Sequence, residues 1–208
     1  MNPGTSNAQS AGSEPPAARA AHTAHASTRE RLLASAADLF YTEGVGVGVE
    51  ALCKAAGVSK RSMYLLFDSK DALVAASLEH RAPVYHALTL PPPDAALGPR
   101  ARILYVFERL EELSARPGYQ GCPFVATAVE LKDPQHPASV VARRNKDALT
   151  EFFRSEAERG GANDPQALAR QLTVVFDGAG ARAVVQAQAL AGLAVTMATT
   201  LMDAAGLE

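Results

Sequence analysis

The chain has 208 residues, a formal net charge of -2 at neutral pH and 48% hydrophobic residues. This length and apolar content suit one small and one larger domain with a substantial core, so no metal or disulfide staple is required. The near-neutral balance argues against a protein that coats nucleic acid without specificity, because such binding depends on phosphate neutralisation by many Lys and Arg residues.

The N-terminal segment, residues 1–26, is rich in Ala, Ser, Gly and Pro and holds almost no large apolar side chains. Such a composition cannot bury enough surface to offset the entropy of ordering, so we expect a disordered tail there. The segment also lacks the apolar stretch with flanking positive charge that is typical of a secretory signal.

A first helix is expected to follow directly, because Ser27 and Glu30 have the spacing of a capping box. Apolar residues then recur at helical spacing, at Leu32, Leu33, Ala36, Leu39 and Phe40. Gly44 is expected to end this helix, since glycine readily adopts the left-handed backbone found after helix ends.

The pattern of residues 52–70 indicates a helix-turn-helix. Small side chains at Ala55 and Ala56 allow two helices to cross closely, and Gly57 suits the sharp turn between them. Ser59 is a good N-cap for a second helix that starts at about Lys60.

The second helix of this motif is expected to enter the major groove of DNA. Met63, Leu66 and Phe67 repeat at three- and four-residue spacing and should face the core, which leaves polar side chains outside. Lys60 and Tyr64 are expected to contact phosphates and Arg61 to read a guanine edge. The candidate DNA contacts are Arg29, Val49, Ser59, Lys60, Arg61, Ser62, Tyr64 and Lys70.

The charge of this region favours a dimer. Residues 28–70 contain six basic and five acidic residues, so their net charge is only +1. We call this N-terminal DNA-binding region the head. Two heads on one operator, roughly 34–36 Å apart, would gain the affinity that a single weakly basic head lacks.

Several short segments between residues 28 and 74 match a known family in the right order. They are Arg-Glu-Arg-Leu-Leu at 29–33, Ala36, Leu39-Phe40, Gly44, Ala-Gly-Val-Ser-Lys at 56–60, Met63-Tyr64, Phe67 and Ser-Lys-Asp-Ala-Leu at 69–73. With these features the chain resembles the TetR family of transcriptional regulators, although Leu65 and Leu66 stand where that family often has His or Tyr. The resemblance implies a homodimer that binds operator DNA and usually acts as a repressor.

The remainder is expected to be helical. Ser69 can cap a fourth helix from Lys70, which would act as a lever, and Pro91-Pro92-Pro93 separates it from the fifth. Proline at a first-turn position marks later helix starts at Pro99, Pro123, Pro137 and Pro165, the last behind Asp164. The expected ranges are 100–113, 124–131, 138–159, 166 to about 188, and about 189–204.

Strand alternation is absent, so the sequence predicts an all-α fold of about nine helices. After the tail at 1–26, a helix-turn-helix DNA-binding domain is expected at 27–71. A ligand-binding and dimerisation domain is expected at 72–208.

The stretch from residue 183 to residue 202 contains no charged residue, a length that could span a membrane. Gln and Thr residues dilute it and Ala dominates its apolar content, so a membrane span is not expected. We expect instead that the last two helices pack against the same helices of a second subunit around a twofold axis.

Aromatic residues spread over four expected helices could line a cavity for an apolar effector, although ordinary core packing is the favoured explanation for any one of them. The candidate effector contacts are Tyr105, Phe107, Phe124, His136, Phe152, Phe176 and Asp177. His136 directly precedes Pro137, where a histidine is more often a capping or surface group.

Catalytic motifs are missing from the sequence: it has no Gly-x-Ser-x-Gly elbow, His-Glu-x-x-His, Cys-x-x-Cys or phosphate-binding loop. We therefore expect neither an enzyme nor a bound cofactor or metal. Cys53 and Cys122 are expected to be reduced thiols of a cytoplasmic protein. Cys53 should pack in the core, and Cys122 either packs or senses oxidants.

The sequence thus predicts a ligand-responsive DNA-binding repressor that works as a homodimer with double-stranded operator DNA and a small-molecule effector. The alternative is a helical small-molecule-binding or interaction protein without a DNA function. That alternative gives no reason why Lys60, Arg61 and Tyr64 should share the outer side of one helix.

Overall fold

The computed structural model describes residues 16–208, with side chains from residue 27 onward. This part of the chain consists of nine helices and no strand, which confirms the all-α prediction. The helices are α1 (Pro16–Glu43), α2 (Val49–Ala56), α3 (Lys60–Leu66), α4 (Lys70–Thr89), α5 (Pro99–Ser114), α6 (Pro123–Leu131), α7 (Pro137–Arg159), α8 (Pro165–Gln186) and α9 (Leu193–Ala204).

The first helix begins earlier than predicted. It starts at Pro16 rather than at a Ser27 cap, so residues 16–26 of the expected tail are helical. This segment is rich in alanine, which has the highest helix propensity, and Pro16 suits a first-turn position. The rest of the expected tail, residues 1–15, lies outside the described residues.

The helix-turn-helix forms as its turn chemistry predicts. Gly57 adopts a left-handed backbone with φ of 64° between α2 and α3. The Ser59 hydroxyl accepts a hydrogen bond from the Ser62 amide at 3.0 Å and caps α3. Ser69 caps α4 in the same way through the Ala72 amide, also at 3.0 Å.

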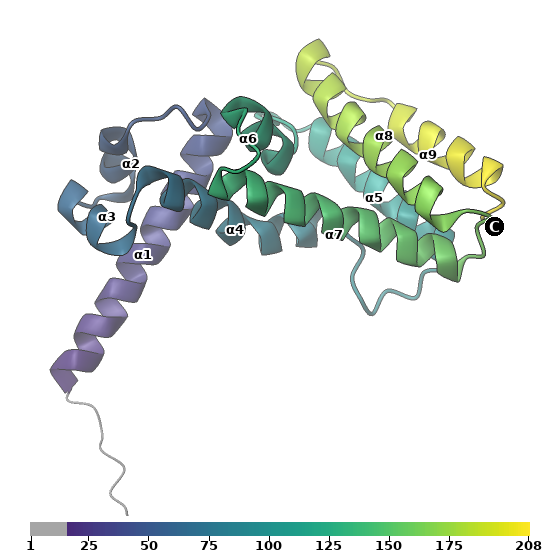
Figure 1. Cartoon of the computed structure of the whole chain (residues 1–208). Coiled ribbons are helices and arrows are strands. Elements are labelled where there is room, and N and C mark those ends of the chain that lie inside the picture. Colours follow the sequence, from purple (N-terminus) through teal and green to yellow (C-terminus); the bar gives the residue numbers. More distant parts are fainter. Residues whose placement is uncertain (1–15) are drawn as a thin grey trace, which may run out of the picture.

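A small core holds α1, α2, α3 and the start of α4 together at one end of the molecule (Figure 1). Its buried members are Leu32, Leu33, Ala36, Leu52, Cys53, Ala56, Met63, Phe67 and Leu73. A separate, larger core at the other end is formed mainly by α5, α7, α8 and α9. The long helices α4 and α7 lie side by side and connect the two ends.

The later helix starts follow the prolines. Pro99, Pro123, Pro137 and Pro165 each occupy the first turn of a helix, and the Asp164 carboxylate accepts a hydrogen bond from the Ala167 amide at 2.9 Å. The last helix starts at Leu193 rather than near residue 189, because Ala187, Ala191 and Gly192 have left-handed backbones that interrupt the helix. None of the described helices has the length and apolarity needed to cross a membrane.

Candidate DNA-binding surface, ligand cavity and junction

The outer side of α3 is the candidate DNA-binding surface. Met63 is fully buried and anchors the inner side of the helix in the head core. On the opposite side Arg61 is exposed, and Tyr64 and Leu65 are exposed to 53% and 68%. The helix therefore presents a guanidinium, a phenol and an apolar side chain together, and the sequence analysis did not include Leu65 in this set.

Lys60, at the first position of α3, is held by an ion pair. Its ammonium donates to the Glu50 carboxylate of α2 at 2.5 Å. This hydrogen bond lowers the pKa of Glu50 and raises the pKa of Lys60. The neighbouring hydroxyls of Ser59 and Ser62 lie 2.9 Å apart and bond to each other. The polar side chains at the start of α3 are therefore held by hydrogen bonds with one another and with α2.

The other candidate DNA contacts lie on neighbouring helices. Arg29 of α1 is exposed, and its guanidinium lies 5.3 Å from the centre of the Phe67 ring. Val49 begins α2, is half-buried and packs against the head core. Lys70 begins α4 and is half-buried.

A cavity of about 100 Å³ lies in the larger part of the molecule between α4, α6, α7 and α8. It is lined by Tyr85, His86, Thr89, Leu90, Cys122, Phe124, Asn145, Lys146, Ala148, Leu149 and Phe176. Two of the predicted effector contacts, Phe124 and Phe176, are among them. Its lining is mostly apolar with a few polar groups, the usual character of a small-molecule site.

Lys146 is the principal polar group of this cavity. Its ammonium bonds to the Asp177 carboxylate at 2.5 Å and lies 4.9 Å from the centre of the Phe176 ring. Burial raises the pKa of Asp177, and the neighbouring Lys146 opposes that shift. Asp177 is therefore placed to hold Lys146 rather than to line the cavity itself.

The remaining polar groups of the cavity are held largely uncharged. Burial lowers the pKa of His86, and a hydrogen bond with Asn145 partly opposes this. Burial also raises the pKa of Tyr85 well above its usual range, and the adjacent Cys122 thiol adds to the shift. At neutral pH these side chains offer neutral hydrogen-bonding groups, and Lys146 supplies positive charge.

Four other predicted effector contacts do not line this cavity. Phe107 is fully buried in the larger core, where its ring centre lies 5.7 Å from that of Phe153 and 6.2 Å from that of Phe176. Phe152 is half-buried and packs against this core, and Tyr105 is a half-buried residue of α5. Core packing, the alternative weighed from the sequence, describes the position of Phe107 well.

His136, the fourth of them, occupies the N-cap of α7. Its Nδ1 accepts a hydrogen bond from the Ala138 amide at 3.1 Å, and its Nε2 lies 3.3 Å from the Asp71 carboxylate of α4. His136 therefore caps α7, which is one of the roles that the sequence left open.

Five polar cavity residues were not predicted from the sequence, namely Tyr85, His86, Thr89, Asn145 and Lys146. They come together only because α4 and α7 pack along each other. Nothing in their local spacing marks them, so only the pairing of the two helices could have identified them.

A second feature is the junction between the head and the rest of the molecule. The Glu130 carboxylate of α6 accepts hydrogen bonds from the Val45 amide at 2.9 Å and the Gly46 amide at 3.2 Å. These amides belong to the turn between α1 and α2. A Cβ added at Gly44 would lie 2.8 Å from the Glu130 oxygens, so the carboxylate would have to shift. Glu130 thus ties α6 directly to the head.

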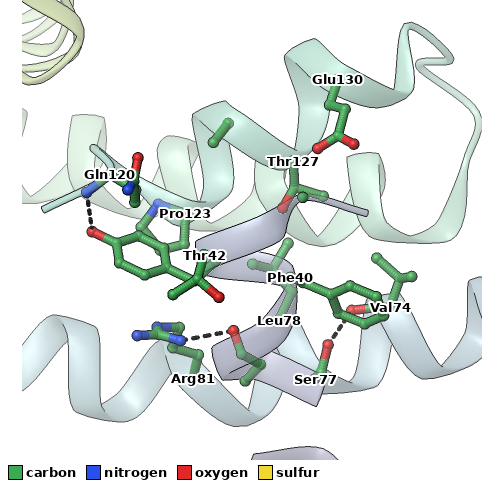
Figure 2. A pocket seen from close by; sticks show the side chains of 14 residues that line it. Phe40, Thr42, Val74, Ser77, Leu78, Arg81, Gln120, Pro123, Thr127 and Glu130 are labelled. Carbon is green, nitrogen blue, oxygen red and sulfur yellow. Dashed lines mark hydrogen bonds between the residues drawn. The ribbon is translucent and has the colours of Figure 1, made fainter. Parts of the chain in front are cut away.

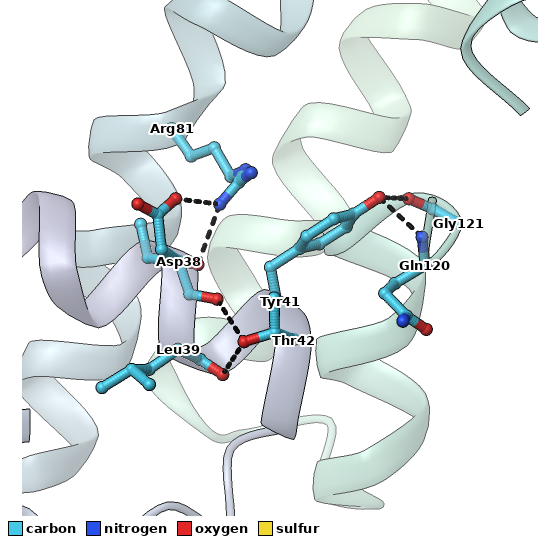
Figure 3. A network of polar contacts seen from close by, with 8 residues as sticks. Asp38, Leu39, Tyr41, Thr42, Arg81, Gln120 and Gly121 are labelled. Atoms are coloured by element: carbon cyan, nitrogen blue, oxygen red, sulfur yellow. Dashed lines mark hydrogen bonds and ion pairs between the residues drawn. The ribbon is translucent and has the colours of Figure 1, made fainter. Parts of the chain in front are cut away.

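Tyr41, near the end of α1, makes a second connection at this junction (Figure 3). Its hydroxyl donates to the Gly121 carbonyl at 3.2 Å and accepts from the Gln120 amide at 2.9 Å. The Arg81 guanidinium of α4 lies 4.5 Å from the centre of the Tyr41 ring and donates to the Ala37 carbonyl at 2.8 Å. Helices α1 and α4 and the segment before α6 are therefore linked by polar contacts.

No group of His, Cys, Asp and Glu residues within the described part of the chain could hold a metal ion.

Comparison with known sequences identifies relatives of the head. A family model described as bacterial regulatory proteins of the tetR family matches residues 32–77. The HTH-type transcriptional repressor NemR of Escherichia coli (strain K12) is 36% identical over 115 residues, which are 54% of this chain and 57% of that protein. The match therefore spans little more than half the length of this curated relative.

Comparison with solved structures extends the similarity to nearly the whole fold. A crystal structure assigned to the TetR transcriptional regulators, from Streptomyces avermitilis MA-4680, is 61% identical with a TM-score of 0.84. The alignment covers 87% of this chain and 99% of that one. The reduced form of E. coli NemR is 24% identical with a TM-score of 0.73, over 85% of this chain and 95% of that one, and supports the fold alone.

Proposed function

Because the chain belongs to the TetR family of transcriptional regulators, we propose that it is a ligand-responsive repressor that leaves its operator when a small molecule enters the cavity between α4, α6, α7 and α8. The observation that carries the DNA-binding part is the outer side of α3. Arg61, Tyr64 and Leu65 project there from a helix anchored by Met63.

In the proposed complex α3 lies in the major groove. Arg61 reads a guanine edge, and the Tyr64 hydroxyl and the Lys60 ammonium contact phosphates. Leu65 is placed to contact a thymine methyl, the apolar group that this groove displays. Arg29, Val49 and Lys70, with Ser59 and Ser62, are proposed as supporting contacts around this helix.

The repressor is proposed to be a cytoplasmic homodimer built through α8 and α9. These helices carry exposed apolar side chains: Val174 at 71%, Val185 at 77%, Leu193 at 40% and Met197 at 45% exposure. A second copy of the same surface would cover them around a twofold axis. The dimer would hold two α3 helices at the spacing of successive major grooves.

The proposed effector is a small aromatic or aliphatic compound with a hydrogen-bond acceptor. The apolar walls at Phe124, Leu149 and Phe176 would bury its body, and Lys146 would bond to the acceptor. Asp177, which holds Lys146, would set the position of that ammonium.

Helix α4 is proposed to transmit the effect, since it carries both Tyr85 and His86 of the cavity and Leu73 of the head core. Binding that favours another orientation of α4 would change the distance between the two heads. Operator and effector would then oppose each other by the same coupling free energy, about 1–3 kcal/mol. Residues 27–71 and 72–208 are proposed as the DNA-binding and the effector-binding domains.

The proposed response to an effector is tested by release of the protein from DNA. The full chain, bound to DNA from beside its own gene, is titrated with a panel of small aromatic acids, amides and alcohols. We expect one class to release the wild-type protein and to act at least tenfold more weakly on Lys146→Met. Release that is identical in Lys146→Met, or caused equally by every compound, would contradict the proposed cavity.

A further inference from the structure

A cavity of about 200 Å³ lies at the junction between α1, α4 and α6 (Figure 2). It shares no lining residue with the proposed effector cavity. Its walls come from the end of α1, the middle of α4 and one side of α6, so it is bounded by both the head and the rest of the molecule.

Two hydroxyl groups in this cavity, those of Ser77 and Thr42, keep acceptor capacity. The Ser77 hydroxyl donates its hydrogen to the Val74 carbonyl at 2.9 Å, and the Thr42 hydroxyl donates to the Asp38 carbonyl at 3.0 Å. Each oxygen keeps lone pairs for a further group.

One charged group of the lining, the Glu130 carboxylate, also favours a hydrogen-bond donor. Glu130 can only accept hydrogen bonds, and its carboxylate is held by the two amides of the Val45-Gly46 turn. No ion pair of Glu130 occurs within the described part of the chain. The positive charge of Arg81 is directed instead to Asp38, 3.4 Å away. One end of the cavity therefore has a negative charge without a cationic partner.

The rest of the wall is apolar and is formed in part by Phe40, Val74 and Leu78, which Figure 2 shows around the hydroxyl groups. Such a wall favours a short hydrocarbon chain beside the acceptor groups. A neutral alcohol would leave the carboxylate charge unbalanced, and an organic anion would be repelled by it.

We propose that this junction cavity binds a small protonated amine with a short apolar chain, whose ammonium pairs with Glu130 while the Thr42 hydroxyl offers a further acceptor in the lining. Because the ligand would touch both α1 and α6, its binding depends on the orientation of the head. Amine and operator would then influence each other's affinity. Only this last consequence rests on the proposed function.

The site is tested on the full chain without DNA. Propylammonium chloride, 1-propanol and sodium propanoate are compared by calorimetric titration at equal ionic strength. We expect saturable binding of propylammonium and at least tenfold weaker binding of the other two compounds. Equal binding of propylammonium and 1-propanol, or no saturable binding of propylammonium, would overturn the proposal.

Two variants locate the binding. Glu130→Gln should weaken propylammonium binding at least tenfold, and Glu158→Gln, the same change on an exposed part of α7, should leave it unaltered. Thr42→Val removes an acceptor without disturbing the Glu130 contacts, and should weaken binding severalfold even if Glu130→Gln does not fold. Unchanged affinity in Thr42→Val, or equal losses in Glu158→Gln and Glu130→Gln, would refute this location. Operator binding by the same proteins is measured separately, so a negative result here does not decide the DNA-binding proposal.

Discussion

The Lys60 ammonium, at the start of α3, lies 2.5 Å from the Glu50 carboxylate of α2. The pair spans the two helices of the helix-turn-helix, and both side chains are largely exposed, at 54% and 83%. Exposed pairs of this kind contribute little to stability. In the proposed DNA complex the pair matters more, because a phosphate would have to compete with Glu50 for the Lys60 charge.

Replacing Glu50 with Gln should strengthen DNA binding. The change frees Lys60 and removes a negative charge near the phosphates, so non-specific affinity should rise severalfold at low salt. The slope of log affinity against log salt should steepen by about 0.9 for each added phosphate contact. Fluorescence anisotropy with a labelled duplex across a salt series measures both quantities.

The matched control is Glu43→Gln, which makes the same change of charge in an exposed residue at the end of α1. An equal gain in affinity in both variants would mean that only the net charge of the head matters, and not the pair between Glu50 and Lys60.

Arg61→Ala should relax the sequence preference at one base pair in each half-site. A lost bidentate contact to guanine costs about 1–3 kcal/mol against the preferred base. Competition binding with operators altered one base pair at a time measures this preference. Arg116→Ala, an exposed site between α5 and α6, serves as control. An Arg61→Ala protein with an unaltered preference profile would remove Arg61 from the base-reading role.

His86 should make the stability of the protein depend on pH. Burial lowers its pKa in the folded state, so the unfolded state takes up a proton more readily. The free energy of unfolding should therefore be highest above about pH 6.5, the pKa of His86 in the unfolded chain, and should fall as the pH drops below that value. Urea unfolding between pH 5 and pH 8 should show that the free energy of unfolding depends less on pH in His86→Gln than in the wild-type protein. Identical curves for both proteins would contradict this account.

The local signals of the sequence predicted the head well, because its turns depend on single residues. Gly57 provides the left-handed turn, and Ser59 and Ser69 cap the following helices as expected. The prolines located the later helix starts for the same reason. The start of α1 was predicted wrongly, because the cap at Ser27 was weighed above the helix propensity of the alanines before it.

The ligand cavity was less predictable, because it depends on which helices pack together. Phe107 and Phe176 look alike in sequence and are both buried in the larger core, yet only Phe176 also borders the cavity. Lys146 had no local signal, since its partner Asp177 is on another helix. The contacts of Glu130 with the turn at Val45 likewise join residues 85 positions apart.

Val185→Glu should dissociate the proposed dimer. The side chain is 77% exposed on α8, and a carboxylate there would be buried without a partner in a twofold interface. Sedimentation velocity should show a monomer whose operator affinity is at least a hundredfold lower. Val140→Glu, at a 47% exposed site on α7, should remain dimeric. A dimeric Val185→Glu protein would place the interface elsewhere.

Phe107→Ala should destabilise the fold by about 3–5 kcal/mol, because the ring is fully buried among other aromatic side chains. The loss is measured by urea unfolding followed by circular dichroism. Phe152→Ala removes a half-buried ring and should cost clearly less. Equal losses would contradict the assignment of Phe107 to the core.

The most direct test of the DNA-binding proposal is titration of the purified full chain onto DNA from beside its own gene. The experiment is repeated across salt concentrations, with an unrelated duplex as competitor. We predict saturable binding by a dimer that resists the competitor and weakens as salt rises. Equal, weak binding to both duplexes would contradict the proposal that α3 reads an operator in that DNA.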